Sequence, residues 1–148
     1  MPFETNTTQA AVGCIGCGTM GGAIMRALTA EYPADRLFVT TGRPERARAF
    51  AAETGVTALG SNRELAEKCD YLFIAVKPAF VREVLEEIRG AFTVQKTVIS
   101  LAAGVSLATL HSYADPSGLS AAPETFVAPH LLRIMPNLPA TVGEAMRQ

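Results

Sequence analysis

Three glycines at G-x-G-x-x-G spacing, Gly16, Gly18 and Gly21, constrain this chain more than any other feature. A short apolar run over residues 10–15 precedes them, and a helical pattern begins at Thr19. A buried parallel strand that passes through a tight turn into a helix has this pattern. Gly16 permits the turn, Gly18 leaves room for a diphosphate to touch the backbone, and Gly21 lets the helix pack closely on the strand. The spacing therefore predicts a dinucleotide-binding turn, since the free N–H groups and dipole of the helix start favour a phosphate.

Strand and helix patterns alternate along nearly the whole chain. We expect strands near residues 10–15, 36–41, 55–59, 71–76, 97–100 and 131–135, with helices near 19–31, 44–53, 63–68, 78–90 and 106–112. Alternation of this kind calls for a parallel sheet with helices on both faces. The predicted fold class is α/β, a Rossmann-type doubly wound and mainly parallel sheet over residues 10–148, after a flexible tail over residues 1–9.

Two further patterns concern a helix face and a loop. Five apolar residues recur at helical spacing in the first helix and predict its buried face: Met20, Ala23, Ile24, Ala27 and Leu28. Residues 114–129 are rich in proline and small polar residues, so we expect a surface loop there. His111 is expected in the last helix and His130 in a proline-rich loop. Each is interpreted as an ordinary exposed or packing histidine, and a catalytic role is the alternative.

The composition limits the classes of function. With 148 residues, the chain has room for one domain with a real core. A formal net charge of -1 offers nothing that attracts nucleic acid or an anionic membrane. No apolar run is long enough to span a bilayer, and the first nine residues lack a basic start and an apolar signal core. A cytoplasmic location is therefore expected.

The three cysteines do not suggest a disulfide framework, because their number is odd and the expected location is cytoplasmic. Cys14 and Cys17 form a C-x-x-C pair, the pattern of a redox couple or half a zinc site. However, Cys14 lies in the predicted buried strand and Cys17 in the glycine turn, with no second pair or nearby histidines to complete four metal ligands. We expect two small packing residues with free thiols, and no metal site.

Ligands of doubly wound sheets sit at the carboxyl ends of the strands. The residues expected there are small, polar or basic: 16–21, 41–43, 75–78, 101–104 and 135–137. They include no Ser-His-Asp set, carboxylate pair or metal cluster, which disfavours hydrolysis. The pattern identifies no catalytic residue.

The end of the second strand bears on which dinucleotide is preferred. A site for the non-phosphorylated form usually places Asp or Glu there, whereas this chain has Thr41, Gly42 and Arg43. The hydroxyl and the guanidinium would bind a 2′-phosphate, so we predict NADP, with NADPH preferred over NADH. The alternative is that Arg43 is a solvated charge. Lys77 is interpreted as lining the nicotinamide pocket with its backbone, and direct acid catalysis by its ammonium is the alternative.

Four ordered motifs together resemble one family, the pyrroline-5-carboxylate reductases of proline synthesis. They are Ile-Gly-Cys-Gly-Thr-Met-Gly at 15–21, Ala-Val-Lys-Pro at 75–78, Ile-Ser-Leu-Ala-Ala-Gly-Val at 99–105, and Arg-Ile-Met-Pro-Asn-Leu-Pro-Ala-Thr-Val-Gly-Glu at 133–144. The resemblance covers about residues 11–146. It implies a dinucleotide-binding domain followed by a helical domain that dimerises and completes the substrate site. It also implies hydride transfer from NADPH or NADH to the C=N carbon of 1-pyrroline-5-carboxylate, giving L-proline.

The resemblance further assigns residues to parts of the cofactor. It implies that Gly16, Cys17, Gly18, Thr19, Met20 and Gly21 form the diphosphate and ribose site. It places Thr41 and Arg43 near the adenosine phosphate and Asn62 near the adenosine. The nicotinamide half would meet Ala75, Val76, Lys77, Pro78 and Ala103, with Asn137 near the same pocket.

Three departures from the family pattern leave alternatives open. Cys17 replaces the more usual alanine, the loop 114–129 is long, and the sequence ends at Gln148, where the helical domain is expected to begin. We therefore expect a chain that binds dinucleotide but reduces the imine poorly unless a homo-oligomer or a separate helical-domain chain supplies that part. The alternatives are a non-catalytic NADP-binding module, a truncated pseudoenzyme, or a related reductase acting on β-hydroxy acids or with a deazaflavin. The combined motifs disfavour the last.

Overall fold

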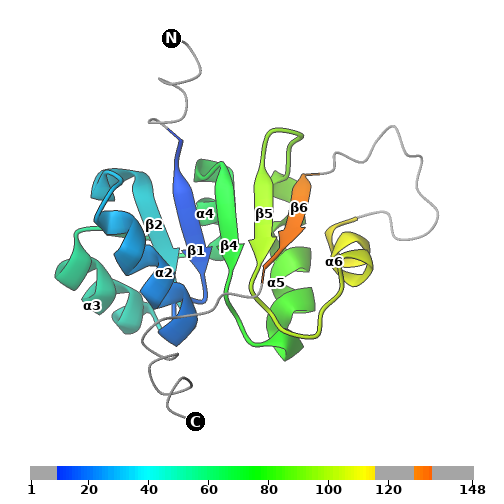
Figure 1. The fold of residues 1–148 in the computed structure, drawn as a ribbon, viewed down its shortest axis with the longest axis horizontal. Coiled ribbons are helices and arrows are strands. Elements are labelled where there is room, and N and C mark those ends of the chain that lie inside the picture. The colour runs from blue at the N-terminus through cyan, green and yellow to red at the C-terminus, as the bar shows by residue number, and fades with distance from the viewer. Residues whose placement is uncertain (1–9, 116–128, 135–148) are drawn as a thin grey trace.

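The computed structural model describes residues 10–115 and 129–134, which form a doubly wound sheet (Figure 1). The six strands are β1 (Val12–Ile15), β2 (Leu37–Thr40), β3 (Thr57–Ala58), β4 (Tyr71–Ile74), β5 (Thr97–Ser100) and β6 (His130–Arg133). Their order is β3-β2-β1-β4-β5-β6, and every neighbouring pair is parallel. The predicted Rossmann-type α/β fold is confirmed. Residues 1–9, 116–128 and 135–148, including most of the predicted loop and the tail, lie outside the described residues.

Five α-helices connect these strands. They are α2 (Thr19–Thr29), α3 (Pro44–Thr54), α4 (Asn62–Lys68), α5 (Val81–Ile88) and α6 (Leu107–Ala114), with short 3-10 helices η1 (Ala34–Arg36), η2 (Pro78–Phe80) and η3 (Arg89–Ala91). Serine hydroxyls cap α4 and α6: Ser61 Oγ accepts from Glu64 N at 3.0 Å and Ser106 Oγ from Thr109 N at 3.1 Å. In contrast, α2 begins after Gly18 with no side-chain cap and no acidic residue in its first turn. Its first N–H groups are therefore not used by a side chain.

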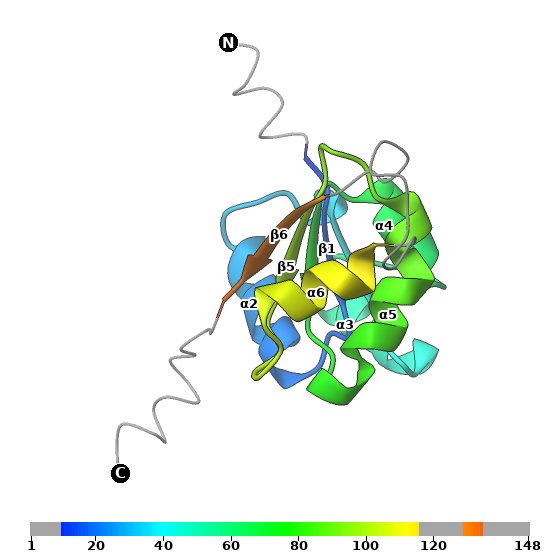
Figure 2. The same ribbon diagram turned by 90° about the vertical axis from the view of Figure 1, so that its right-hand side faces the viewer.

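The helices lie on both faces of the sheet and enclose two cores (Figures 1 and 2). Helices α4, α5 and α6 cover one face, where Leu72, Ile74 and Val98 are buried. On the other face, α2 and α3 pack Met25 and Phe50 against β1 and β2. Each core removes apolar side chains from water, which is the main contribution that holds the layers together.

The buried face of α2 differs from the prediction. The residues fully buried in this helix are Gly21, Gly22 and Met25, whereas Met20 and Ile24 are only partly buried. A Cβ on Gly21 would lie 2.7 Å from Cys14 Sγ, so the glycine side of the helix must face the sheet. The prediction missed Met25 as well as the two glycines, because glycines carry no apolar side chain and leave Met25 alone to mark this face.

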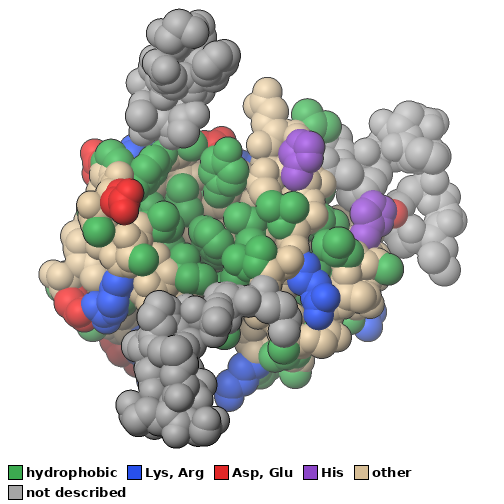
Figure 3. Space-filling view, in the orientation of Figure 1, with side chains coloured by type: hydrophobic (Ala, Val, Ile, Leu, Met, Phe, Trp, Pro, Cys, Tyr) green, Lys and Arg blue, Asp and Glu red, His purple; other side chains and the backbone are tan. Residues whose placement is uncertain are grey.

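One face of the sheet is left open over β4, β5 and β6, and apolar side chains gather there in the space-filling view (Figure 3). In register, Phe73 pairs with Ile99, and Ile99 with Leu132, which is 48% exposed. His130 is the exposed first residue of β6 and not part of a loop, so its predicted position is wrong. None of the helices in the described part of the chain is long and apolar enough to cross a membrane.

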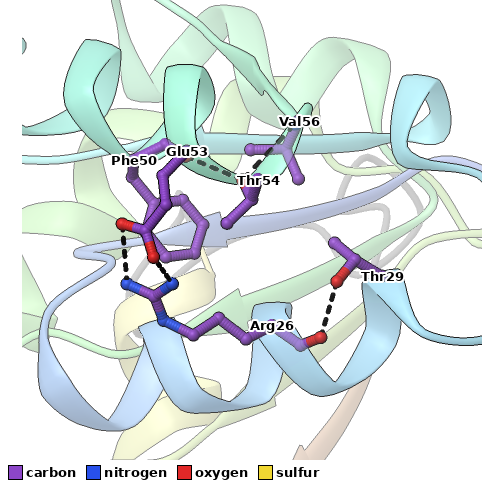
Figure 4. Close-up of polar contacts among 6 residues, drawn as sticks. All are labelled: Arg26, Thr29, Phe50, Glu53, Thr54 and Val56. Carbon is purple, nitrogen blue, oxygen red and sulfur yellow. Dashed lines mark hydrogen bonds and ion pairs between the residues drawn. The ribbon is translucent and has the colours of Figure 1, made fainter.

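Arg26 ties α2 to α3 (Figure 4). Its guanidinium forms an ion pair with Glu53, with Nη2 donating to Oε1 at 3.2 Å, and lies 4.8 Å from the centre of the Phe50 ring. Arg26 lies in the last turn of α2 and Glu53 is the second-last residue of α3, so this contact joins the C-terminal ends of the two helices.

Candidate functional site

A cavity of about 530 Å³ opens at the carboxyl ends of β1, β2 and β4. The strand order reverses between β1 and β4, because β2 and β3 lie on one side of β1 while β4, β5 and β6 lie on the other. A crevice at such a switch point is where doubly wound sheets bind their ligands. The lining residues are Ile15, Gly16, Cys17, Gly18, Thr19, Thr41, Gly42, Arg43, Arg46, Asn62, Ala75, Val76, Lys77, Phe80, Glu83, Val84 and Glu87.

The glycine turn forms one end of the cavity, and its three glycines meet different constraints. Gly16 has a φ of +80°, and a Cβ there would lie 2.5 Å from Val76 Cγ1. A Cβ on Gly21 would also lie 2.9 Å from the Cβ of Ala75. At Gly18, by contrast, the nearest atom would be 3.9 Å away. The turn and packing predictions for Gly16 and Gly21 are confirmed, while Gly18 leaves open space on the cavity side.

Thr40, at the end of β2, holds the turn in place. Its carbonyl oxygen accepts the N–H groups of Gly16 and Cys17 at 3.0 and 3.1 Å. Its hydroxyl donates to Asn62 Oδ1 at 2.5 Å, and Asn62 Nδ2 donates to Glu87 Oε1 at 3.0 Å. The buried Thr40 therefore joins the turn to the start of α4, and Asn62 joins both to the last turn of α5.

The opposite end of the cavity is basic. Thr41 and Arg43 both line it, as the sequence predicted for residues that follow β2. The Thr41 hydroxyl donates to the carbonyl oxygen of Arg43, which orders this short connection before α3. Arg46, three residues further along α3, also lines the cavity, so two exposed guanidinium groups face it from one helix start.

The third wall comes from the end of β4. Ala75, Val76 and Lys77 line the cavity, and Lys77 has an extended backbone with φ of −61° and ψ of 149°. An extended residue before a proline is the expected conformation, and its exposed ammonium does not need to leave water. Phe80, 52% exposed, stands at the rim beyond it.

Not every predicted residue belongs to the lining. Met20 and Gly21 lie within the first turn of α2, Pro78 begins η2 behind Lys77, and the exposed Ala103 follows β5 at the same edge of the sheet. Asn137 lies outside the described residues. The structure therefore brings ten of the predicted residues together in one cavity: Gly16, Cys17, Gly18, Thr19, Thr41, Arg43, Asn62, Ala75, Val76 and Lys77.

The two cysteines of the C-x-x-C pair interact. All three cysteines are buried with free thiols. A hydrogen bond from Cys14 lowers the pKa of the Cys17 thiol, and the charge of Arg26 acts in the same direction. The same hydrogen bond, together with burial, raises the pKa of Cys14. Cys69 is a different case, because burial raises its pKa to about 12. The described residues contain no cluster of three or more metal-ligating side chains.

The residues around this cavity fit a dinucleotide. The uncapped start of α2 and the open space at Gly18 would receive a diphosphate, since helix N–H groups and backbone can then approach it. Arg43 and Arg46 would meet a further phosphate. The polar residues of this arrangement that the sequence did not single out as site residues are Thr40, Arg46, Glu83 and Glu87. Helical spacing from Arg43 could have indicated Arg46, but no local pattern brings α5 to this cavity.

Comparison with known proteins supports this geometry. Residues 11–104 match the family described as NADP oxidoreductase, coenzyme F420-dependent. The chain belongs to this family. Its relatives include pyrroline-5-carboxylate reductases, as the four sequence motifs predicted. The pyrroline-5-carboxylate reductase of Escherichia coli (strain K12) is 35% identical over 137 residues, which cover 91% of this chain and 47% of that protein.

Solved structures of pyrroline-5-carboxylate reductases share the fold of this chain. The enzyme of Plasmodium falciparum, solved with NADP bound, superposes with a TM-score of 0.68 at 26% identity, covering 92% of this chain and 45% of that one. The enzyme of Coxiella burnetii gives a TM-score of 0.69 at 20% identity, covering 94% and 68%. The chain spans about half the length of the curated relatives it matches.

Proposed function

We propose that this chain binds NADPH in the cavity between the glycine turn and the start of α3, and presents it for reduction of 1-pyrroline-5-carboxylate to L-proline. The observation that carries the proposal is that the uncapped α2 start and the Arg43–Arg46 pair face one cavity at the switch point of the sheet. The names of the relatives supply the substrate class, and the NADP bound to the Plasmodium falciparum enzyme supplies the cofactor class.

The residues divide the binding task between them. Gly18 and the first N–H groups of α2 would hold the diphosphate, and Arg43 and Arg46 would hold the 2′-phosphate. Asn62 Oδ1 accepts from Thr40 and Asn62 Nδ2 donates to Glu87, so both groups of the amide are held in place, and Asn62 would lie beside the adenosine. The connection between β2 and α3, residues 41–43, contains no acidic residue, which would leave the ribose 2′-position to the basic side chains. We therefore expect NADPH to bind more tightly than NADH.

When bound, the nicotinamide ring supplies a hydride. The chain's own part in that step is to position the ring and keep water away on one side. Val76 and the extended backbone of Lys77 would line the nicotinamide half, with Pro78 and Ala103 beside it at the same edge of the sheet. Donor and acceptor carbons must be held about 3–3.5 Å apart, and this wall fixes only the donor.

Two alternatives give the same cavity a different role. The first is a related reductase that transfers the hydride of NADPH to a deazaflavin, because the family description names coenzyme F420. The second is a non-catalytic NADP-binding module, which would bind the cofactor without turnover.

The experiment compares the chain of residues 1–148 with a chimera in which the second half of the Escherichia coli relative is fused after it. With NADPH and 1-pyrroline-5-carboxylate, the chimera should form proline, whereas the 148-residue chain should bind NADPH and form almost none. If the folded chimera oxidises NADPH with the deazaflavin and forms no proline from 1-pyrroline-5-carboxylate, the proposed substrate is wrong. NADPH binding in both proteins with no turnover of either acceptor would favour the non-catalytic module.

A further inference from the structure

Glu87, in the last turn of α5, lines the proposed cofactor cavity although a carboxylate repels phosphate. The side chain is exposed, and its Oε1 accepts a hydrogen bond from Asn62 Nδ2 at 3.0 Å. Val84, three residues earlier on the same helix, adds an apolar side chain to this wall. The α5 wall is therefore suited to an uncharged part of the ligand, whereas the phosphates fit the glycine turn and the basic end of the cavity.

Asn62 connects Glu87 to the buried end of β2. Its Oδ1 accepts from the Thr40 hydroxyl at 2.5 Å, and the Thr40 carbonyl oxygen accepts the N–H groups of Gly16 and Cys17. These hydrogen bonds form a continuous chain from α5 through the start of α4 to the glycine turn. Thr40 is 3% exposed, whereas Asn62 and Glu87 line the cavity, so a ligand meets the α5 end of the chain at those two residues.

Glu87 determines the direction of this hydrogen-bond chain, because an ionised carboxylate only accepts hydrogen bonds. An asparagine amide can exchange the places of its oxygen and nitrogen, and a threonine hydroxyl can donate or accept. Beside Glu87, however, the Asn62 nitrogen must face the carboxylate, so the amide oxygen faces Thr40 and the hydroxyl must donate. Glu87 uses one N–H of Asn62 Nδ2, and the second has no partner among the described residues.

We propose that Glu87 is a positioning residue for the cofactor: it holds the Asn62 amide so that the second N–H donates to an acceptor atom of the adenosine. This inference rests on the proposed binding of NADPH. The adenosine carries acceptor atoms on its ribose and on its adenine ring, and it has no charge for Glu87 to repel. Glu87 thus raises the affinity through Asn62, although its own charge does not attract the ligand.

The test measures how tightly Glu87→Met and Glu87→Gln bind NADPH and 2′,5′-ADP, which contains the adenosine and the 2′-phosphate but no nicotinamide. Both substitutions remove the charge and keep a side chain of similar length, but only glutamine can still accept from Asn62. Loss of one hydrogen bond in Glu87→Met should weaken the binding of both ligands by about threefold to tenfold in calorimetry. Glu87→Gln should lose less, because it keeps an acceptor for Asn62.

Glu86→Met is the matched control on the same helix. The exposed Glu86 accepts a hydrogen bond from Arg82 Nε at 2.9 Å and does not belong to the cavity lining. Its substitution removes the same charge from α5 and should change the Kd of either ligand by less than about twofold. Denaturant unfolding of each variant shows that the compared proteins are folded.

A double-mutant cycle with Asn62→Ala distinguishes positioning from a structural role of Glu87 in α5. In the Asn62→Ala background, Glu87→Met should weaken NADPH binding no further, because the amide that Glu87 holds is absent. NMR gives a second readout, the amide N–H signals of the Asn62 side chain, which are identified by their absence from Asn62→Ala. These signals should shift when 2′,5′-ADP is added, and should already differ in ligand-free Glu87→Met.

The proposal is overturned if Glu87→Met binds both ligands as tightly as the unaltered chain, or if it loses as much affinity without Asn62 as with it. It is also overturned if NADPH binding weakens while 2′,5′-ADP binding does not, because the contact would then lie outside the adenosine half. These outcomes leave the proposed function intact. If the unaltered folded chain binds neither ligand, the proposed function fails together with this inference.

Discussion

At the glycine turn the cavity wall is made of backbone, whereas at the start of α3 it is made of long charged side chains. The turn is constrained on every side: Val76 packs against Gly16, Cys14 and Ala75 pack against Gly21, and Thr40 binds its N–H groups. At the start of α3, by contrast, Arg43 and Arg46 are exposed, and they line the cavity with flexible charged side chains. The turn should therefore determine whether the chain folds and binds a dinucleotide at all, while the arginines determine which dinucleotide it prefers.

The largest effect is expected at the turn itself. Gly16→Ala places a Cβ 2.5 Å from Val76 Cγ1 in a left-handed conformation, which alone costs about 1–2 kcal/mol. We expect a lower free energy of unfolding, measured with denaturant, and loss of NADPH binding. Gly18→Ala is the matched control, because its φ is −96° and its Cβ would meet nothing closer than 3.9 Å.

The control should separate folding from binding. Gly18→Ala should unfold within about 0.5 kcal/mol of the unaltered chain, yet bind NADPH more weakly because its methyl group projects into the cavity. If Gly16→Ala is as stable as Gly18→Ala, the close packing of Val76 against Gly16 does not stabilise the fold.

A smaller and more selective effect is expected at the basic end. Arg43→Glu replaces a charge-assisted hydrogen bond to phosphate, which is about 1.5–3 kcal/mol, by repulsion. NADPH affinity should fall by about tenfold to a hundredfold, while NADH affinity should change by less than about threefold, so that the preference reverses. Arg43→Gln serves as the neutral control and should lie between the two. Parallel losses for both dinucleotides would show that Arg43 acts through folding.

The smallest effect is expected at the exposed Arg26–Glu53 ion pair, which joins the last turns of α2 and α3 (Figure 4). The hydrogen bond from Arg26 lowers the pKa of Glu53 in the folded chain. The stabilisation is therefore present above the ordinary glutamate pKa and is lost as the pH falls through the lowered value. Denaturant unfolding at several acidic pH values should show a shallower pH dependence for Glu53→Gln. If the free energy of unfolding depends on pH identically in both proteins, the Arg26–Glu53 ion pair does not stabilise the folded chain.

The turn was predictable from the sequence because its determinants are local. Gly16 and Gly21 follow a strand and open a helix, where the tight turn requires glycine at the first position and the close packing of the helix on the strand requires it at the second. The place of Thr41 and Arg43 followed in the same way, since residues after a parallel strand gather at one edge of the sheet. Position along the chain was sufficient for each of these predictions.

The remaining features depend on packing between distant segments. The sequence gives no sign that Glu87 of α5 accepts a hydrogen bond from Asn62 of α4, or that Thr40 joins them to the turn. The buried face of α2 was missed because the contact is made by Gly21 and Gly22, which add nothing to a hydrophobic pattern. The predicted role of Asn137 remains a prediction, because that residue lies outside the described part of the chain.

The most direct test of the central claim is calorimetric titration of the reduced 148-residue chain with NADPH and with NADH under the same conditions. A backbone-lined diphosphate site beside a basic 2′-phosphate site predicts saturable binding of both, with NADPH tighter by about tenfold or more. Equal Kd values for the two dinucleotides, or no binding of either by the folded chain, would contradict the account.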